Sequence, residues 1–267
     1  MRKHFTGLIN ETRSAQQRGN LPARQKRRNM NKEKTNIEQT GNTEDNLNVG
    51  VQLRVSLPPR ILVACEYSGI VREAFAAAGF DAWSCDVLET ELPGKHIKDD
   101  VLQHLNDGWD MMIGHPPCTY LSFAANHVWY KEGRARKRLE ALNFFLQLWE
   151  APIEKICLEN PMGIVDRVIK KHTQIINPYY FGDNEVKRTC LWLKGLPKLI
   201  HKKEDDLFNK KTHIDKPEPM YTRYDGKSIY FSEGKHGGHE RSKFFPSVAA
   251  AMAGQWGEFL MRTKRSN

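Results

Sequence analysis

The sequence lacks several features that would indicate a membrane, secreted or metal-cluster protein. No apolar run approaches the roughly 20 residues that cross a bilayer, and the first residues are basic, without the apolar core of a secretion signal. The five cysteines are scattered, odd in number and without a C-x-x-C pair. Such cysteines are typical of reduced thiols and not of a disulfide framework or a zinc cluster. We therefore expect a cytoplasmic protein with no membrane segment and no bound metal.

Most of the chain also lacks a net excess of basic or acidic residues. The net charge is +9, but the first 60 residues hold 12 basic and 5 acidic residues, which leaves a balance of +2 for the remainder. Residues 1–58 are polar, poor in aromatic residues and without an apolar period, which predicts a disordered basic extension. Its cations between Arg24 and Arg28 either contact phosphates nonspecifically or belong to a dispensable solvated segment. The basic composition is therefore not, by itself, evidence for a nucleic-acid enzyme.

An ordered domain is predicted to begin near residue 59 with a βαβ unit. Residues 61–65 form an apolar strand, residues 66–69 a tight turn, residues 71–78 a helix, and residues 80–85 a second strand that ends at Asp86. In nucleotide-binding units of this layout the helix N-terminus accepts an anionic group and the acid binds ribose hydroxyls. Gly69 alone stands where a dinucleotide fingerprint has several glycines, so a purely structural βαβ unit is the alternative.

The most informative stretch is Trp109–Ser122, with the sequence W-D-M-M-I-G-H-P-P-C-T-Y-L-S. Its first five residues predict a buried strand, which Pro116 and Pro117 end because neither has an N–H to donate. Cys118 therefore follows the carboxyl end of a strand, where α/β sheets bind ligands. The alternative is a buried structural cysteine, which the two prolines and the polar neighbours make the weaker interpretation.

A second chemical group is predicted at the same edge of the sheet. Residues 155–159 form another strand, which ends in Glu159-Asn160-Pro161. A single crossover helix, residues 131–149, separates it from the Cys118 strand, so both strand ends should lie together. A thiol and a carboxyl that converge on one pocket form a two-part catalytic device. The cations in the first turns of the helix either balance an anion such as a DNA phosphate or form a solvated face, and residues 123–130 are expected to be a mobile loop.

These motifs together resemble those of a known family. P-P-C at Pro116–Cys118, E-N-P at Glu159–Pro161 and Y-S-G at Tyr67–Gly69 occur in the order found in cytosine-C5 methyltransferases, and the sequence is similar to compact phage-type DNA cytosine methylases. The resemblance covers most of residues 60–194 and resumes at Phe245–Met252. It implies a Rossmann-like α/β methyltransferase core at residues 59–195, a small target-recognition insert at 196–244 and a C-terminal helix at 245–267 that completes the core.

The resemblance also implies a role for individual residues. Cys118 corresponds to the nucleophile, Glu159 to the acid that contacts the cytosine ring, and Lys187 or Arg188 to the basic residue that helps to hold the flipped base. Asp86 corresponds to the ribose ligand, and Asp100, after a short predicted strand, to the acid that binds the adenine amino group. The remaining cofactor contacts that the resemblance implies are Tyr67, Ser68, Gly69, Pro117, Ser247 and Val248.

The expected chemistry is methyl transfer from S-adenosylmethionine to C5 of cytosine. A thiolate that adds to C6 makes C5 nucleophilic, and C6 is reached only when the base is flipped out of the stack. We expect cytosine-containing DNA as the substrate of a monomer in a bacterial or phage-infected cell, with restriction–modification as one role. RNA as the substrate, or a degenerate DNA-binding relative, are the alternatives. An amino-methylating enzyme is disfavoured, because His115 is a poor acceptor for an exocyclic amine and Cys118 cannot stack on the base.

The insert at residues 196–244 is short and charged, with a predicted hairpin at Asp225-Gly226. Its His236 and His239 lack a cysteine or a third partner, so a solvated loop is expected there and not a metal site. Few base contacts fit into so short an insert. The sequence therefore predicts a short or relaxed recognition site, with affinity carried mainly by phosphate contacts.

Overall fold

The computed structural model describes residues 57–205, 210–230 and 243–265. The other residues lie outside the described part of the chain, and with them nearly all of the predicted basic extension, its Arg24–Arg28 cluster and the pair His236 and His239.

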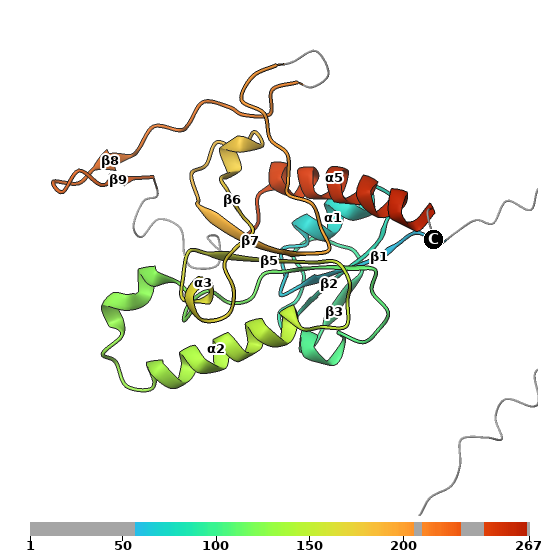
Figure 1. The fold of residues 1–267 in the computed structure, drawn as a ribbon, viewed down its shortest axis with the longest axis horizontal. Coiled ribbons are helices and arrows are strands. Elements are labelled where there is room, and N and C mark those ends of the chain that lie inside the picture. The colour runs from blue at the N-terminus through green and yellow to red at the C-terminus, as the bar shows by residue number, and fades with distance from the viewer. Residues whose placement is uncertain (1–56, 206–209, 231–242, 266–267) are drawn as a thin grey trace, which may run out of the picture. The chain divides into compact units, whose positions relative to one another are not determined.

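A seven-stranded sheet with the order β3-β2-β1-β4-β5-β7-β6 lies at the centre of the fold (Figure 1). The strands β3, β2, β1, β4 and β5 are parallel, whereas β7 is antiparallel to both β5 and β6. This is the α/β, Rossmann-like architecture that the sequence predicted. The strand bounds are Arg60–Ala64 for β1, Asp81–Asp86 for β2, His96–Lys98 for β3, Met111–Gly114 for β4, Ile156–Pro161 for β5, Gln174–Ile176 for β6 and Thr189–Lys194 for β7.

Helices cover both faces of the sheet, which explains why its central strands are apolar throughout. Successive side chains of a strand point to opposite faces, so Ile61 and Val63 pack with α1 and α5, while Leu62 packs with α2. The helices are α1 (Ile70–Ala77), α2 (Arg134–Trp149), α3 (Val165–Val168) and α5 (Pro246–Arg265), with 3-10 turns η1 (Val101–Gln103), η2 (Phe123–Val128) and η3 (Pro178–Tyr180). The predicted C-terminal helix is thus α5, which packs beside α1 (Figure 1).

Two local predictions have opposite outcomes. The hairpin at Asp225-Gly226 is confirmed, because β8 (Tyr221–Thr222) pairs with β9 (Ser228–Ile229) and Gly226 adopts the positive φ of 77° that this turn needs. The mobile loop at residues 123–130 is wrong in part. Residues 123–128 form η2, whose first turn is capped by the Ser122 hydroxyl, which accepts a hydrogen bond from the Ala124 N–H at 3.1 Å.

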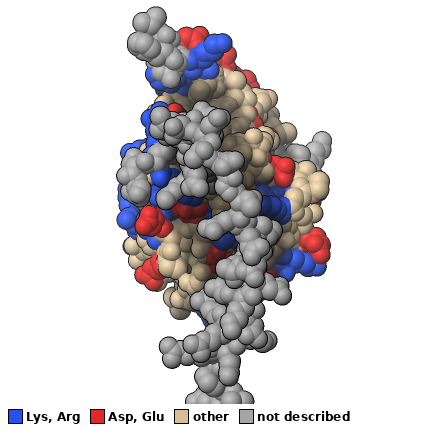
Figure 2. Space-filling view, turned by 90° about the vertical axis from the view of Figure 1, so that its right-hand side faces the viewer, with Lys and Arg blue, Asp and Glu red and all other residues tan. Residues whose placement is uncertain are grey.

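The described surface matches the small charge balance of the folded residues. Basic and acidic side chains are interspersed on the face seen in Figure 2. No helix in the described part of the chain is long and apolar enough to cross a membrane.

Candidate active site

The five cysteines differ in exposure, and the difference singles out Cys118. Cys118 is exposed at the end of β4, whereas burial above all raises the pKa of the four other thiols, to about 11 for Cys85 and Cys190. The pKa values of Cys65 and Cys157 are also raised, again chiefly by burial. A buried thiol that holds its proton is a poor nucleophile. The position of Cys118 therefore agrees with the sequence-based choice of nucleophile and not with a structural cysteine.

The E-N-P motif fixes the P-P-C motif directly. Asn160 is 1% exposed, and its side-chain amide donates a hydrogen bond of 2.6 Å to the backbone carbonyl of Pro116. The Cys118 carbonyl then accepts from the N–H groups of Leu121 and Ser122 at 3.0 and 2.9 Å, which forms a tight turn. Sequence reasoning had used only the glutamate of this motif. Asn160 therefore fixes the backbone of the segment that leads to Cys118.

The segment after β5 also contacts the end of the Cys118 loop, at residues 121 and 122. The Ile164 N–H donates to the Leu121 carbonyl at 2.9 Å, and Ser122 forms an isolated β-bridge with Gly163. A Cβ atom on Gly163 would lie 2.1 Å from the Leu121 oxygen, so only glycine allows this approach. The loop is thus joined to the strand that carries Glu159.

The cations at the start of α2 have a role that neither sequence-based alternative foresaw. Arg138 donates to the Tyr120 carbonyl at 2.8 Å and lies 4.1 Å from the centre of the Trp129 ring. Arg134 lies 4.9 Å from the centre of the Tyr120 ring. These two arginines hold the Cys118 loop against α2 through a carbonyl and two aromatic faces. Arg136, which pairs with Glu140 at 2.8 Å on the exposed face, fits the solvated alternative.

Glu159 lies beside the carboxyl end of β4, as predicted. Gly114 pairs with Leu158, so the next residues, His115 and Glu159, are neighbours across the two strands. The His115 Nδ1 atom is 3.4 Å from the Glu159 Oε2 atom, and both side chains are 12% exposed. The other ring nitrogen of His115, Nε2, is buried and has no hydrogen-bond partner among the described residues. Sequence reasoning considered His115 only as an acceptor for an amine and missed this contact.

The charge state of Glu159 is set by three influences. Burial alone would raise the pKa of this carboxyl, but the hydrogen bond from His115 and the positive charge of Lys187 outweigh burial and hold the pKa below its ordinary value. His115 also lowers the pKa of Glu66, the buried acid after β1, although burial still raises that pKa overall. His115 therefore lies between two carboxyl groups, and Glu159 is ionised at neutral pH in the free protein.

The two basic residues before β7 point to different places. β7 is antiparallel to β5, so Lys187 and Arg188 precede the end of β7 that lies beside Glu159. The charge of Lys187 acts on Glu159, and its Nζ atom lies 5.3 Å from the centre of the Phe245 ring. Arg188 instead acts on the buried Cys190 and lines a separate cavity. Of the two residues that the resemblance left open, the geometry favours Lys187 as the one whose charge acts on Glu159.

This difference predicts the outcome of a titration. Lys187→Met or His115→Gln removes an interaction that favours the ionised carboxylate, so the pKa of Glu159 should rise in both variants. Arg188→Met, the matched control, should leave it unchanged. The measurement is a 13C NMR titration of labelled glutamate side chains, with the Glu159 signal assigned by its absence in Glu159→Gln. A rise in Arg188→Met but not in Lys187→Met would reverse the assignment.

The N-terminus of α1 differs from the prediction. The sequence suggested that its amides would accept an anionic ligand, but the Glu66 carboxylate accepts hydrogen bonds from the N–H groups of Val71 and Arg72 at 2.7 and 3.1 Å. Glu66 is 3% exposed and thus fills this position itself. The turn at Tyr67, Ser68 and Gly69 still lies at the end of β1, with Ser68 buried and Gly69 at a φ of 76°. Gly69 is required there because a Cβ atom would lie 2.6 Å from the buried Arg72 guanidinium.

The two acids that the resemblance assigns to the cofactor lie close to one another. Asp86 ends β2, and Asp100 caps η1 by accepting from the Leu102 N–H at 3.0 Å. After burial, the charges of Asp86 and Asp100 are among the causes that raise the pKa of Cys65, at the end of β1. The structure thus brings both carboxylates around the same thiol, at the carboxyl ends of the parallel strands.

The segment that leads into α5 contacts both the residue after β4 and the loop after β2. The Phe244 ring lies 4.8 Å from the His115 ring, centre to centre, and Lys243 forms an ion pair of 3.0 Å with Glu91 in the loop after β2. The Ser247 N–H lies 3.4 Å from an oxygen of Asp183, and the other Asp183 oxygen is buried without a partner among the described residues. Val248 is 1% exposed and packs in the core, so its side chain faces away from solvent. Pro117, in contrast, is exposed beside Cys118.

A cluster of Asp166, His172 and Cys190 has its possible ligand atoms within 4.8 Å of one another. The Asp166 carboxylate already accepts hydrogen bonds from the backbone N–H and the Nδ1 atom of His172, at 2.8 and 2.6 Å. Burial raises the pKa of Cys190 to about 11, and a thiol must lose its proton to bind a metal. We interpret the cluster as a brace between α3 and β7, and the absence of a metal stays a prediction.

Comparisons with known proteins add little. No family model and no curated protein matches the chain. Among solved structures, the chain is similar to a protein described as a DNA modification methyltransferase encoded within an Escherichia coli prophage, with 17% identity and a TM-score of 0.36 over 60% of this chain and 52% of that one. It is also similar to the Entamoeba histolytica methyltransferase EhMeth, with 12% identity and a TM-score of 0.36 over 60% of this chain and 58% of that one. The chain thus spans little more than half of either structure, and neither likeness supports an argument about its function.

Proposed function

We propose that this protein is an S-adenosylmethionine-dependent methyltransferase that acts on C5 of cytosine in DNA. The observation that supports the proposal is that β4 and β5 are neighbouring parallel strands, with Cys118 in the loop after β4 and Glu159 near the carboxyl end of β5. The exposed thiol, and an acid held by His115 and Lys187, are the two groups that addition to a cytosine ring requires.

The residues of the chain account for activation of the base. The Cys118 thiolate adds to C6, which forms the S–C6 bond and moves the electron pair of the C5–C6 double bond to C5. Glu159, ionised in the free protein, takes up a proton from solvent when the base binds and shares it with ring N3, which neutralises the negative charge that develops on the ring. His115 positions Glu159, and Lys187 lies within electrostatic reach of the same carboxylate. Once C5 has bonded to the methyl group, loss of the C5 proton to a water molecule restores the double bond and expels the thiolate.

The acidic residues that we assign to the cofactor fit S-adenosylmethionine. That molecule carries a sulfonium, an ammonium, ribose hydroxyls and an adenine amino group, all of which favour carboxylate acceptors. Asp86 and Asp100 lie together at the strand ends, and a buried Asp183 oxygen near Ser247 has no partner among the described residues. We assign Asp86 to the ribose, Asp100 to the adenine amino group, and the turn at residues 67–69 with Pro117, Ser247 and the backbone of Val248, whose side chain packs in the core, to the remaining contacts. When bound, the cofactor supplies an electrophilic methyl group.

DNA as the substrate and residues 196–244 as a recognition insert belong to the same proposal. The hairpin β8–β9 projects from the body of the fold in Figure 1 and exposes Tyr221, Arg223 and Tyr224. Aromatic and cationic side chains of this kind suit contacts with a nucleic-acid strand.

Bisulfite sequencing of DNA from cells that express the protein tests the function. We expect protected cytosines in a short sequence context, and none in cells that express Cys118→Ser at the same level. The RNA of the same cells provides the second arm. Methylation confined to RNA would replace DNA as the substrate, and protection that persists with Cys118→Ser would contradict the mechanism.

A calorimetric titration separates the cofactor half from the catalytic half. Asp86→Ala removes hydrogen-bond acceptors for the ribose, so the affinity for S-adenosylmethionine should fall about tenfold or more, as for the loss of charged hydrogen bonds. Asp110→Ala, just before β4 and thus at the amino ends of the parallel strands, is the control and should leave the affinity unchanged. Unchanged binding in Asp86→Ala would remove this residue from the cofactor site.

A further inference from the structure

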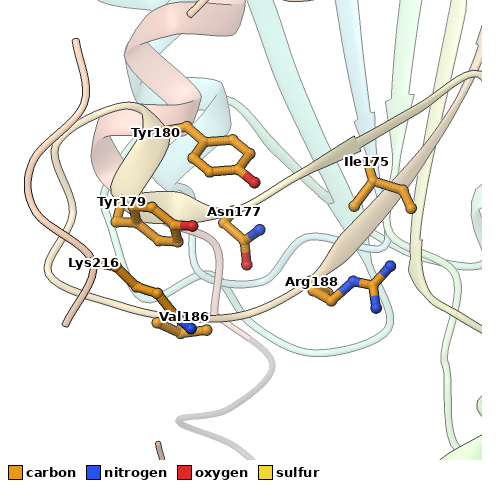
Figure 3. A pocket seen from close by; sticks show the side chains of 7 residues that line it. All are labelled: Ile175, Asn177, Tyr179, Tyr180, Val186, Arg188 and Lys216. Carbon is orange, nitrogen blue, oxygen red and sulfur yellow. The ribbon is translucent and has the colours of Figure 1, made fainter. Parts of the chain in front are cut away.

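A cavity of about 450 Å³ lies beside the proposed active site, between β6, η3 and the start of β7. Arg188 lines it, one residue along the chain from Lys187, whose charge acts on Glu159. Lys216, from the insert, lies on the side of the cavity opposite Arg188 (Figure 3). The rings of Tyr179 and Tyr180 also line the cavity. The segment before β7 thus contributes one residue to the cavity and the next residue to the surroundings of Glu159.

The most informative side chain of the cavity is Asn177. It is 6% exposed, and its Oδ1 atom is buried with no hydrogen-bond partner among the described residues. Asn177 stands at the N-terminal cap of η3, but its side chain makes no capping hydrogen bond there. A buried carbonyl oxygen without a partner is costly for the folded protein, so such a group is usually satisfied by a ligand or by ordered water. Figure 3 shows Asn177 between the tyrosine rings and Arg188, among the residues that would surround that ligand.

Further lysines lie beyond this cavity, next to the same two tyrosines. A second cavity of about 280 Å³ shares Tyr179, Tyr180 and Lys216 with the first, and adds Lys203 and Lys211. The Tyr180 ring is braced by stacking on the rings of His201 and His213, each 4.6 Å away, centre to centre. A braced aromatic pair between cations is the arrangement that holds a nucleic-acid strand by base stacking and phosphate contacts.

We propose that the Asn177 cavity binds a DNA base next to the target cytosine, and that it selects adenine. An asparagine amide pairs with adenine through two hydrogen bonds, because its oxygen accepts from the N6 amino group while its NH2 group donates to N7. Tyr179 and Tyr180 offer an aromatic surface for the base, and Arg188 and Lys216 neutralise the adjoining phosphates. This inference rests on the proposed function and extends it, since it moves part of the sequence selectivity from the insert to the segment between β6 and β7.

The test combines binding with methylation on DNA duplexes that carry one cytosine with randomised neighbours. Wild-type protein should favour adenine at one neighbouring position, in methylation and in equilibrium binding by fluorescence anisotropy. Asn177→Leu, of similar size but without polar atoms, should reduce that preference about tenfold or more at this position alone, as expected for one bidentate pair. Asn184→Leu, an exposed asparagine on the same segment outside both cavities, is the matched control, and Arg188→Met should weaken binding to every sequence alike.

The outcomes distinguish this inference from the proposed function. Methylation with a neighbour preference that is the same in wild type and Asn177→Leu would overturn the cavity assignment while the function stands. An adenine preference in binding that Asn177→Leu removes, without any methylation, would retain the cavity and overturn the function. Equal loss of affinity for all sequences in Asn177→Leu would mean that the cavity holds the DNA backbone, and would overturn base recognition. Melting temperatures of both leucine variants near that of wild type would show that the comparison is between folded proteins.

Discussion

Replacing Cys118 with serine is expected to lower methyl transfer to the level of a reaction without protein. A serine hydroxyl is not ionised near neutral pH, and no other described group lies in the place of the Cys118 thiol to add to C6. The loop itself should survive, because its hydrogen bonds use the backbone of Cys118 and not its side chain. Transfer of a labelled methyl group to DNA is the measurement.

Cys85→Ser is the control for this variant, since it also replaces a thiol by a hydroxyl, but at a buried position on β2. It should retain activity, apart from any loss of stability that a melting curve would reveal. Full activity of Cys118→Ser would remove covalent catalysis from the account.

Replacing Glu159 with glutamine should lower turnover on the order of a hundredfold or more, the usual contribution of a positioned proton donor or acceptor. The amide keeps the shape of the side chain but cannot share a proton with ring N3. Binding of S-adenosylmethionine, measured by calorimetry, should stay nearly intact because the cofactor contacts are assigned to other residues.

Glu154→Gln is the matched control, because this glutamate is exposed and precedes the same strand at its opposite end. It should change neither turnover nor cofactor binding. Loss of cofactor binding in Glu159→Gln, with normal turnover at saturating cofactor, would mean that the two halves of the site are reversed.

The parallel half of the sheet could be predicted from the sequence because its signals are local. Each of the strands β1, β4 and β5 contains a run of three or four apolar residues that is buried, and a glycine or a proline lies at its end or in the chain that follows. The pairing of β1 with β2 also follows from a short crossover, through α1. The strand β6 has only three residues, Gln174–Ile176, and its pairing with β7 depends on contacts between distant parts of the sheet. A pattern of three residues carries no periodicity that could have revealed it.

The site could be predicted as a set of residues but not as a set of contacts. The choice between Lys187 and Arg188 depends on how the segment before β7 approaches β5, which follows from the antiparallel pairing of these two strands. The contact between His115 and Glu159 likewise needs the pairing of Gly114 with Leu158. The N-terminus of α1 was expected to accept a ligand because the sequence does not show that the Glu66 side chain turns back onto it.

The central claim, a covalent bond between Cys118 and the target base, is tested most directly with DNA that contains 5-fluorocytosine. Fluorine at C5 cannot leave as a proton does, so the elimination step fails and the protein stays attached to the DNA. We predict a complex that resists denaturation with the wild-type protein and S-adenosylmethionine, the same complex with Cys85→Ser, and none with Cys118→Ser. A complex that persists without Cys118, or its absence with a wild-type protein that methylates ordinary cytosine, would contradict the account.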